Sequence, residues 1–229
     1  RIETLTLLVQ LTAKRDILIE ELKQKNNLPL RYLLEKVRID NNLDFLTLTD
    51  ARGFVVVRAR YPYNVQDDQS NDALVSQALG GEYIAGTQII PQEILDKEGE
   101  GLAEKAFMIF VNTPRTAPRA RDRETDGMVI KAAVPVFDSN DELLGVLYGG
   151  ILLNRSYEIV DRVKDIVYKN ETYQGREIGT ATIVQWDLRV STNVKNSRGL
   201  RAIGTRVSED VYKKVLENGE PYIGRAYVV

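Results

Sequence analysis

Residues 128–153 constrain the fold most, because they contain two long apolar, β-branched runs separated by a very short connection. The runs are residues 128–137 and 143–153, and the linker 138–142 is rich in Asp, Asn and Ser, whose side chains favour tight turns. This pattern predicts an antiparallel hairpin. Both runs are apolar at nearly every position, so we expect both faces of the hairpin to be covered. A plain central hairpin of an α+β domain would satisfy the same pattern.

The hairpin also contains glycines and a proline whose positions have structural meaning. Gly145, Gly149 and Gly150 lie inside the second run, and a glycine within a strand marks a close approach to the backbone by a helix or a ligand. Pro135 has no backbone N–H to donate, which predicts a sheet edge or a bulge there.

Composition narrows the classes of function. The chain has 229 residues, enough for one large domain or two small ones, and its 43% hydrophobic and 28% charged content is ordinary for a globular protein. Its net charge of −2 gives no basic surface, so we do not expect nucleic acid as a partner. No apolar run reaches the roughly 18 residues of a membrane span.

The chain contains neither cysteine nor histidine. This removes zinc sites made of those residues, Ser-His-Asp and Cys-His nucleophile pairs, and the commonest general base. A metal site or a catalytic pair would have to be built from carboxylates. The absence of these residues makes an enzyme less favoured without excluding one, and it leaves acid-residue chemistry for an enzyme. We predict no cofactor and no metal.

Residues 1–44 are predicted to be helical. Apolar residues recur at three- and four-residue spacing from Ile2 to about Asn26. Pro29 interrupts this helix and suits the first turn of a second piece that runs towards Ile39. Together the pieces would span roughly 55 Å. They either fold back on each other at Pro29, or form a stalk that leaves a membrane and pairs with its twin in a homodimer. Because the chain begins inside this helix, we expect a longer parent protein.

Residues 45–153 are predicted to form an α+β module with an antiparallel sheet of about five or six strands. The helix at 73–79 should end at Gly80-Gly81, since glycine is the usual helix terminator. Residues 113–126 form a basic loop punctuated by prolines. The remaining predicted elements are strands at 45–49, 54–58, 87–90 and 106–111 and a short helix beginning at 91–95.

A connecting segment, residues 154–179, should contain a helix from about Arg155 to Lys169, capped by Asn154. Residues 180–229 then repeat the pattern of the first module, with strand–turn–strand at 180–192 and a helix at 211–216. Chance similarity is the alternative to an internal repeat. The repeat has no counterpart of the closing hairpin and would expose a sheet edge. We therefore expect the parent protein to continue past Val229, or another element to cover this edge.

These motifs resemble a known family, the tandem (double) Cache sensor domains of bacterial transmembrane histidine kinases and chemoreceptors. The first module is similar to it in its leading helix and in VR at 57–58, ALGG at 78–81, AAVPVFD at 132–138 and LGVL at 144–147. The second module is similar in DLRVSTNV at 187–194, RAIGTRV at 201–207 and GRAYVV at 224–229.

The resemblance implies a long N-terminal helix followed by two PAS-like (Cache) modules with antiparallel sheets, the second truncated. Residues 45–153 would be distal from the membrane and residues 180–229 proximal. It further implies the extracytoplasmic, ligand-sensing part of a membrane-tethered receptor. Such a receptor would form a homodimer through the N-terminal helix and pass its signal through stalk helices.

The residues themselves suggest where a ligand would bind. Lys131 lies in an apolar run, so its ammonium group must either reach water or meet an anion, and Tyr148 lies in the neighbouring strand. Arg58 and Arg115 could hold a carboxylate with the planar guanidinium fork, or be ordinary surface charges.

Tyr83, Phe107 and Thr113 could line the same cup, or be ordinary core and loop residues. The hypothesised ligand is a small organic anion, such as a carboxylate or amino acid, bound in the first module. The full aromatic-plus-arginine pattern of amino-acid-binding Cache domains is not found, and the one tryptophan, Trp186, lies in the second module.

Two other classes of function remain. One is a hydrolase that uses Asp67-Asp68 or Glu98 and Glu100, although these lie in polar loops where solvated charges are expected. The other is a ligandless dimerisation or interaction module, which predicts a cup filled by its own side chains.

Overall fold

The computed structural model describes residues 1–169, 171–173 and 176–224, and divides the chain into two compact units. Unit 1 comprises Arg1–Glu104 and Asp126–Leu152, and unit 2 comprises Lys105–Thr125 and Leu153–Val229. The sequence predicts residues 105–125 as part of the first module, whereas in the structure they belong to unit 2.

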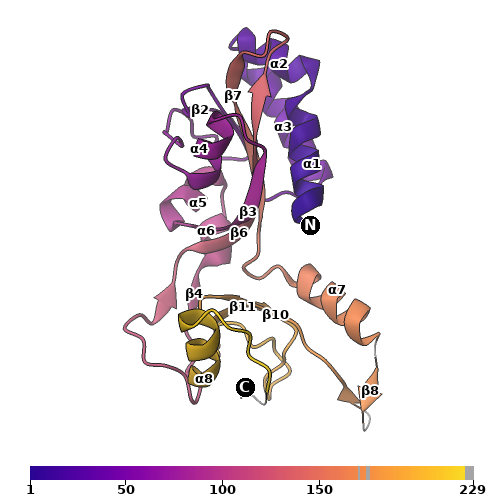
Figure 1. Ribbon diagram of the computed structural model, residues 1–229, viewed down its shortest axis with the longest axis vertical. Coiled ribbons are helices and arrows are strands. Elements are labelled where there is room, and N and C mark those ends of the chain that lie inside the picture. The colour runs from indigo at the N-terminus through magenta and orange to yellow at the C-terminus, as the bar shows by residue number, and fades with distance from the viewer. Residues whose placement is uncertain (170, 174–175, 225–229) are drawn as a thin grey trace. The chain divides into compact units, whose positions relative to one another are not determined.

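Unit 1 is built on a five-stranded antiparallel sheet in the order β2-β1-β7-β6-β3 (Figure 1). The predicted hairpin supplies two inner strands, β6 and β7, whose residues are almost all buried. Helices α1 and α3 lie on one side of this sheet and α4 and α5 on the other. The strands are β1 (Phe45–Thr49), β2 (Val55–Arg58), β3 (Ile84–Ile90), β6 (Gly127–Phe137) and β7 (Leu143–Leu152), and the helices are α1 (Ile2–Ala13), α2 (Asp16–Lys23), α3 (Asn27–Asp40), α4 (Ala73–Leu79) and α5 (Gln92–Glu98). A further short helix, α6 (Leu102–Ala106), which the sequence does not predict, spans the division between the units.

The N-terminal segment is helical as predicted, but it forms the separate helices α1, α2 and α3 and not one helix kinked near Pro29. The backbone of Arg15 is extended, which ends α1, and Lys25 adopts a left-handed conformation with φ of 56° between α2 and α3. Pro29 lies in the first turn of α3, where its missing N–H costs no helical hydrogen bond. Packing decides the outcome, since α1 contacts β6 through Leu5 and Val9 and α3 packs against β1 and β2.

Each special residue of the hairpin has a specific neighbour. A Cβ placed on Gly145 would lie 2.0 Å from the carbonyl oxygen of Thr49, and one on Gly150 would lie 2.4 Å from the Phe45 ring. The predicted close approach is therefore confirmed, and the approaching element is strand β1. Pro135 lies beyond the end of β3, which pairs with β6 only as far as Ala133, and a bulge follows immediately.

The hairpin turn is held by Asp138, as its Asp- and Asn-rich composition suggests. One carboxylate oxygen accepts the backbone N–H groups of Asn140 and Glu142, and the other accepts Lys23 Nζ at 2.6 Å. The hydrogen bond from Lys23 and those from the two backbone groups lower the pKa of Asp138 to about 2. The turn is thus tied to the end of α2.

Unit 2 contains a hairpin, β10 and β11, in the place predicted for the second strand–turn–strand. Its other elements are short, apart from one helix. The predicted strand at 106–111 is reduced to β4, because Ala106 still belongs to α6. The elements are β4 (Met108–Ile109), β5 (Arg123–Glu124), α7 (Tyr157–Tyr168), β8 (Thr172–Tyr173), β9 (Arg176–Glu177), β10 (Thr182–Gln185), β11 (Leu188–Thr192), α8 (Glu209–Tyr212) and the π-helix η1 (Lys213–Glu217).

Asn154 does not cap α7, as the sequence had suggested. Ser156 precedes the helix, and no side chain among the described residues caps it. Asn154 is instead fully buried, and its amide nitrogen donates to the carbonyl oxygen of Ala106 and to Oε1 of Gln185.

The α+β fold with antiparallel sheets is confirmed. Residues 225–229 of the predicted second-module motif lie outside the described residues. No helix within the described ranges has the length and apolarity to cross a membrane.

Candidate functional site

A set of buried charged and aromatic side chains lies on the α4–α5 side of the unit 1 sheet. We call it the polar cluster. It joins residues from both hairpin strands, from β2 and from the loop and helix ends that cover this side of the sheet. Its members are Arg58, Asp67, Asp72, Glu98, Lys131 and Tyr148.

The ammonium group of Lys131 pairs with a carboxylate inside the protein and does not reach water. This decides between the two outcomes that the sequence left open. Its side chain is 2% exposed, and Nζ lies 2.8 Å from Oδ2 of Asp72 and 4.4 Å from the centroid of the Tyr148 ring. Burial lowers the pKa of Lys131, and the opposing attraction of Asp72 offsets part of this effect. A strand of apolar neighbours therefore carries a cation whose charge is held by one carboxylate and one aromatic face.

Asp72 also caps the N-terminus of α4. Its Oδ1 accepts the backbone N–H groups of Leu74 and Val75, so it is the N-cap of the helix. Its Oδ2 accepts Gln88 Nε2 at 2.7 Å as well as Lys131. Burial raises the pKa of Asp72, but the charge of Lys131 and these hydrogen bonds bring it below its ordinary value. The same carboxylate thus joins α4 to strands β3 and β6.

Arg58 is fully buried, so the alternative of an exposed surface arginine is wrong. Its guanidinium forms a bidentate pair with Asp67 at 2.6 and 2.9 Å, donates to the carbonyl oxygen of Asn64, and contacts Glu98 at 3.1 Å. Burial lowers the pKa of Arg58, yet the hydrogen bond to Asp67 and the charge of Glu98 raise it above its ordinary value. Nε of Arg58 is buried and has no hydrogen-bond partner among the described residues.

Glu98 lies at the centre of the cluster. Its side chain is 1% exposed and accepts Thr47 Oγ1 at 2.6 Å, Tyr148 Oη at 2.7 Å and the Arg58 guanidinium. Burial and the neighbouring Glu98 carboxylate raise the pKa of Tyr148 well above its ordinary value, so the phenol stays protonated and donates. Glu98 is buried, so the expectation that it is solvated is wrong. Asp67 is half-buried and paired with Arg58, and Asp68 and Glu100 are exposed as expected.

The cluster balances its own charges almost completely. Arg58 and Lys131 face the carboxylates of Asp67, Asp72 and Glu98, which leaves an excess of one negative charge when all are ionised. Such an arrangement can bind charged groups by exchanging partners. In the part of the chain that the structure describes, no group of three or more acidic side chains is placed to hold a metal ion.

The other predicted site residues do not join this cluster. Tyr83 is 44% exposed just before β3, and the remaining three belong to unit 2. Thr113 is buried, where its Oγ1 donates to Val111 and accepts the backbone N–H of Arg206. Phe107 is half-buried, and Arg115 is exposed with its carbonyl oxygen accepting Glu209 N–H.

Sequence reasoning missed Asp72 and Gln88 as site residues. Asp72 had a detectable signal, because an Asp directly before a predicted helix is a typical N-cap. Gln88 carries no local signal, and only the pairing of β3 with β6 brings it near Lys131.

Comparison with known proteins gives a sequence match for one part of the chain. Residues 151–229 match the family model of single Cache domain 3. The Cache resemblance predicted from the motifs is confirmed by this match over those residues. No curated protein sequence matches the chain.

Solved structures with similar folds have low sequence identity to this chain. The Escherichia coli DcuS sensor domain is 16% identical with a TM-score of 0.44, over 67% of this chain and 89% of that one. The periplasmic domain of Vibrio cholerae LuxQ is 15% identical with a TM-score of 0.48, over 86% and 74%. The ligand-binding domain of the Pseudomonas aeruginosa PAO1 amino acid chemoreceptor PctC, in complex with GABA, is 14% identical with a TM-score of 0.41, over 99% and 76%.

Proposed function

We propose that the chain is the extracytoplasmic ligand-sensing part of a Cache-type bacterial membrane receptor, a histidine kinase or chemoreceptor, and that unit 1 binds a small organic anion at the polar cluster. The sequence match of residues 151–229 supports the receptor class. The proposed domain is itself non-catalytic, is tethered to a membrane in its parent protein, and works as a homodimer.

The observation that carries the proposal is the burial of Lys131 and Arg58 together on one side of an apolar sheet. Burying a cation costs free energy unless the cation is paired. Buried ionisable side chains are therefore characteristic of binding and catalytic sites. A guanidinium fork and an ammonium group are well suited to a carboxylate. Tyr148 Oη adds a donor, since its proton is retained.

Binding at this cluster would be an exchange of partners. A ligand carboxylate would take the place of Asp72 at Lys131 or of Glu98 at Arg58. Because Asp72 also caps α4, its release would alter the start of that helix. The protein would then have two arrangements, with Asp72 bound to Lys131 or released from it. The ligand can shift the equilibrium between them only by the difference in its affinity for the two, and the start of α4 is the structure that would change.

A calorimetric and thermal-shift screen against acetate, succinate, citrate and the common amino acids tests this proposal. Saturable binding should raise the unfolding midpoint. A ligand concentration a hundredfold above Kd adds about 2.7 kcal/mol to the free energy of unfolding. Tyr148→Phe, which removes one hydroxyl, and Lys131→Met should each weaken binding at least about tenfold. The matched control is Lys36→Met, since Lys36 is exposed and pairs with Asp40 of the same helix, α3.

A folded protein with no midpoint shift for any of these compounds would contradict the proposal. It would favour the second candidate, a ligandless interaction module. That candidate has its own support, because the polar cluster fills this side of the sheet with mutually paired side chains, as the sequence analysis expects of such a module.

A further inference from the structure

Unit 2 contains a cleft of about 520 Å³ that the proposed function of unit 1 does not use. This volume lies within the usual range of small-molecule pockets, roughly 300–1,000 Å³. We call it the Trp186 cleft. Its lining includes the loop 117–119, the β10–β11 turn and the α8–η1 segment, with Arg119, Trp186, Asp187, Arg206, Tyr212 and Lys213 as the residues relevant here.

Trp186 exposes a large aromatic surface from a backbone position that bulky residues rarely adopt. Its side chain is 59% exposed although the residue sits in a tight hairpin turn, and its backbone has φ of 56°, in the left-handed region that bulky residues avoid. Strained backbone conformations of this kind persist only where the surrounding structure enforces them, and they are concentrated at ligand-binding and active sites.

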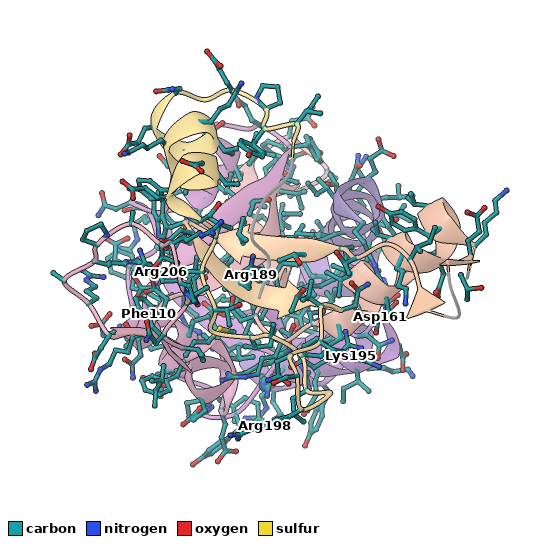
Figure 2. All side chains as sticks on the ribbon, turned by 90° about the horizontal axis from the view of Figure 1, so that it is seen from below. Phe110, Asp161, Arg189, Lys195, Arg198 and Arg206 are labelled. Carbon is teal, nitrogen blue, oxygen red and sulfur yellow. The ribbon has the colours of Figure 1, made fainter. Side chains whose placement is uncertain are left out.

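The wall beside Trp186 carries two arginines that share one carboxylate, that of Asp187. Arg119 Nη1 donates to one oxygen of Asp187 at 2.8 Å, and Arg206 Nε donates to the other at 2.7 Å. Arg119 also stacks over the Phe110 ring at 4.7 Å and touches Glu124 at 3.5 Å. Figure 2 labels Arg206 and Phe110, which are linked through Arg119 on the Phe110 ring and through Asp187, the carboxylate that Arg119 and Arg206 share. Two guanidinium groups carry more donors than the buried Asp187 carboxylate can accept.

Another part of the lining is the α8–η1 segment. Tyr212 ends α8, and the chain continues as a π-helix from Lys213, a form that is rare and frequent at functional sites. Lys213 pairs with Glu209 at 2.7 Å, and Glu217 also lines the cleft. This segment therefore adds a second aromatic ring and charges of both signs.

We propose that the Trp186 cleft binds a planar aromatic carboxylate, with the ring on Trp186 and Tyr212 and the carboxylate against Arg119 and Arg206. Aromatic faces stack on one another, and a guanidinium fork donates two hydrogen bonds to a carboxylate. The lining carries three basic side chains, Arg119, Arg206 and Lys213, and three acidic ones, Asp187, Glu209 and Glu217. A carboxylate is favoured by the guanidinium donors that exceed what Asp187 can accept. This site is independent of the polar cluster in unit 1.

The test uses Trp186 as its own reporter, since it is the one tryptophan of the chain. Tryptophan fluorescence is titrated with benzoate, with cyclohexanecarboxylate, which has the charge without the flat ring, and with benzyltrimethylammonium, which has the ring with the opposite charge. Benzoate should give a saturable change with a Kd at least about tenfold lower than either of the others. Equal or non-saturating quenching by all of them would overturn the proposal.

Variants separate this site from general effects on folding. Arg119→Gln should weaken benzoate binding at least about tenfold, as loss of a charge-assisted contact requires. Arg119→Lys keeps the charge near Asp187 but loses the fork and should also weaken binding, which covers the case in which Arg119→Gln fails to fold. Arg198→Gln, in an exposed turn of unit 2, and Lys36→Met, on the exposed face of α3 in unit 1, should leave the curve unchanged. An unchanged Kd in a folded Arg119→Lys variant would contradict the assignment.

Discussion

At the scale of the residue, Lys131 and Asp72 show how a charge is retained inside an apolar sheet. A buried pair is poor evidence of net stabilisation, because removing both ions from water costs nearly as much as their attraction returns. Loss of one partner is different, since it leaves the other charge buried and unpaired. Asp72 is partly protected against this loss, because two backbone N–H groups and Gln88 also donate to it.

This argument predicts a non-additive double-mutant cycle. Lys131→Met should lower the free energy of unfolding by about 3 kcal/mol, through the uncompensated Asp72 carboxylate. Asp72→Asn keeps a good N-cap for α4 but leaves the buried Lys131 ammonium group without its carboxylate, so it should cost at least as much. The double variant should be more stable than the sum of the two losses implies. Urea denaturation measures all four proteins, and strict additivity would mean that the ion pair has no coupling energy.

The residue scale also shows what the sequence can and cannot predict about the site. A lysine between Ile130 and Ala132 requires a water-exposed route or an anion, and this local argument is sufficient to identify Lys131 as a special position. The identity of the anion is not local, because Asp72 reaches Lys131 only when α4 packs on the hairpin. Arg58 illustrates the same limit, as its partner Glu98 is brought close by α5 and not by any pattern around Arg58.

At the scale of the element, the β6–β7 hairpin is held in the sheet by close contacts that glycine permits. A Cβ on Gly145 would lie 2.0 Å from Thr49 O, a backbone atom of β1 that cannot move without breaking the β1–β7 ladder. Gly86, on strand β3, has no atom within 4 Å of the same position. The two glycines therefore form a matched pair within one sheet.

We predict that Gly145→Ala lowers the free energy of unfolding by about 3 kcal/mol, the upper end of ordinary overpacking costs. Gly86→Ala should be close to neutral or slightly stabilising, since alanine has less unfolded-state entropy to lose than glycine. Chemical denaturation of both variants checks the pair. Similar losses in both would show that the loss of glycine, and not the contact with Thr49, is responsible.

The elements also differ in how far the sequence specifies them. The hairpin is predictable because its apolar runs, turn residues and glycines all agree with one structure. The break between α1 and α2 is not predictable, because Lys14 and Arg15 contain no helix-breaking residue and the apolar spacing continues across them. Packing of α1 on β6 and of α2 on α3 ends the helix there.

At the scale of the whole molecule, the proposed homodimer depends on an outward-facing surface of α1. Leu5 and Val9 of this helix are buried within unit 1, whereas Leu7 and Leu11 are 55% and 58% exposed. These two leucines are four residues apart and so lie on the same helical face. A second copy of α1 is the partner expected from the proposed receptor class.

We predict that Leu7→Glu combined with Leu11→Glu weakens self-association at least about tenfold, because burying each leucine is worth roughly 1.5–3 kcal/mol. The unfolding free energy of the monomer should change little, since neither side chain packs within unit 1. The matched control is Val163→Glu combined with Ile166→Glu, an exposed apolar pair on α7 that the proposed dimer does not use. Sedimentation velocity over a range of concentrations measures the association. If the unsubstituted protein stays monomeric, or if the control variant dissociates as readily, the α1 face is excluded as the dimer contact. The N-terminal helices would then have only a packing role inside unit 1.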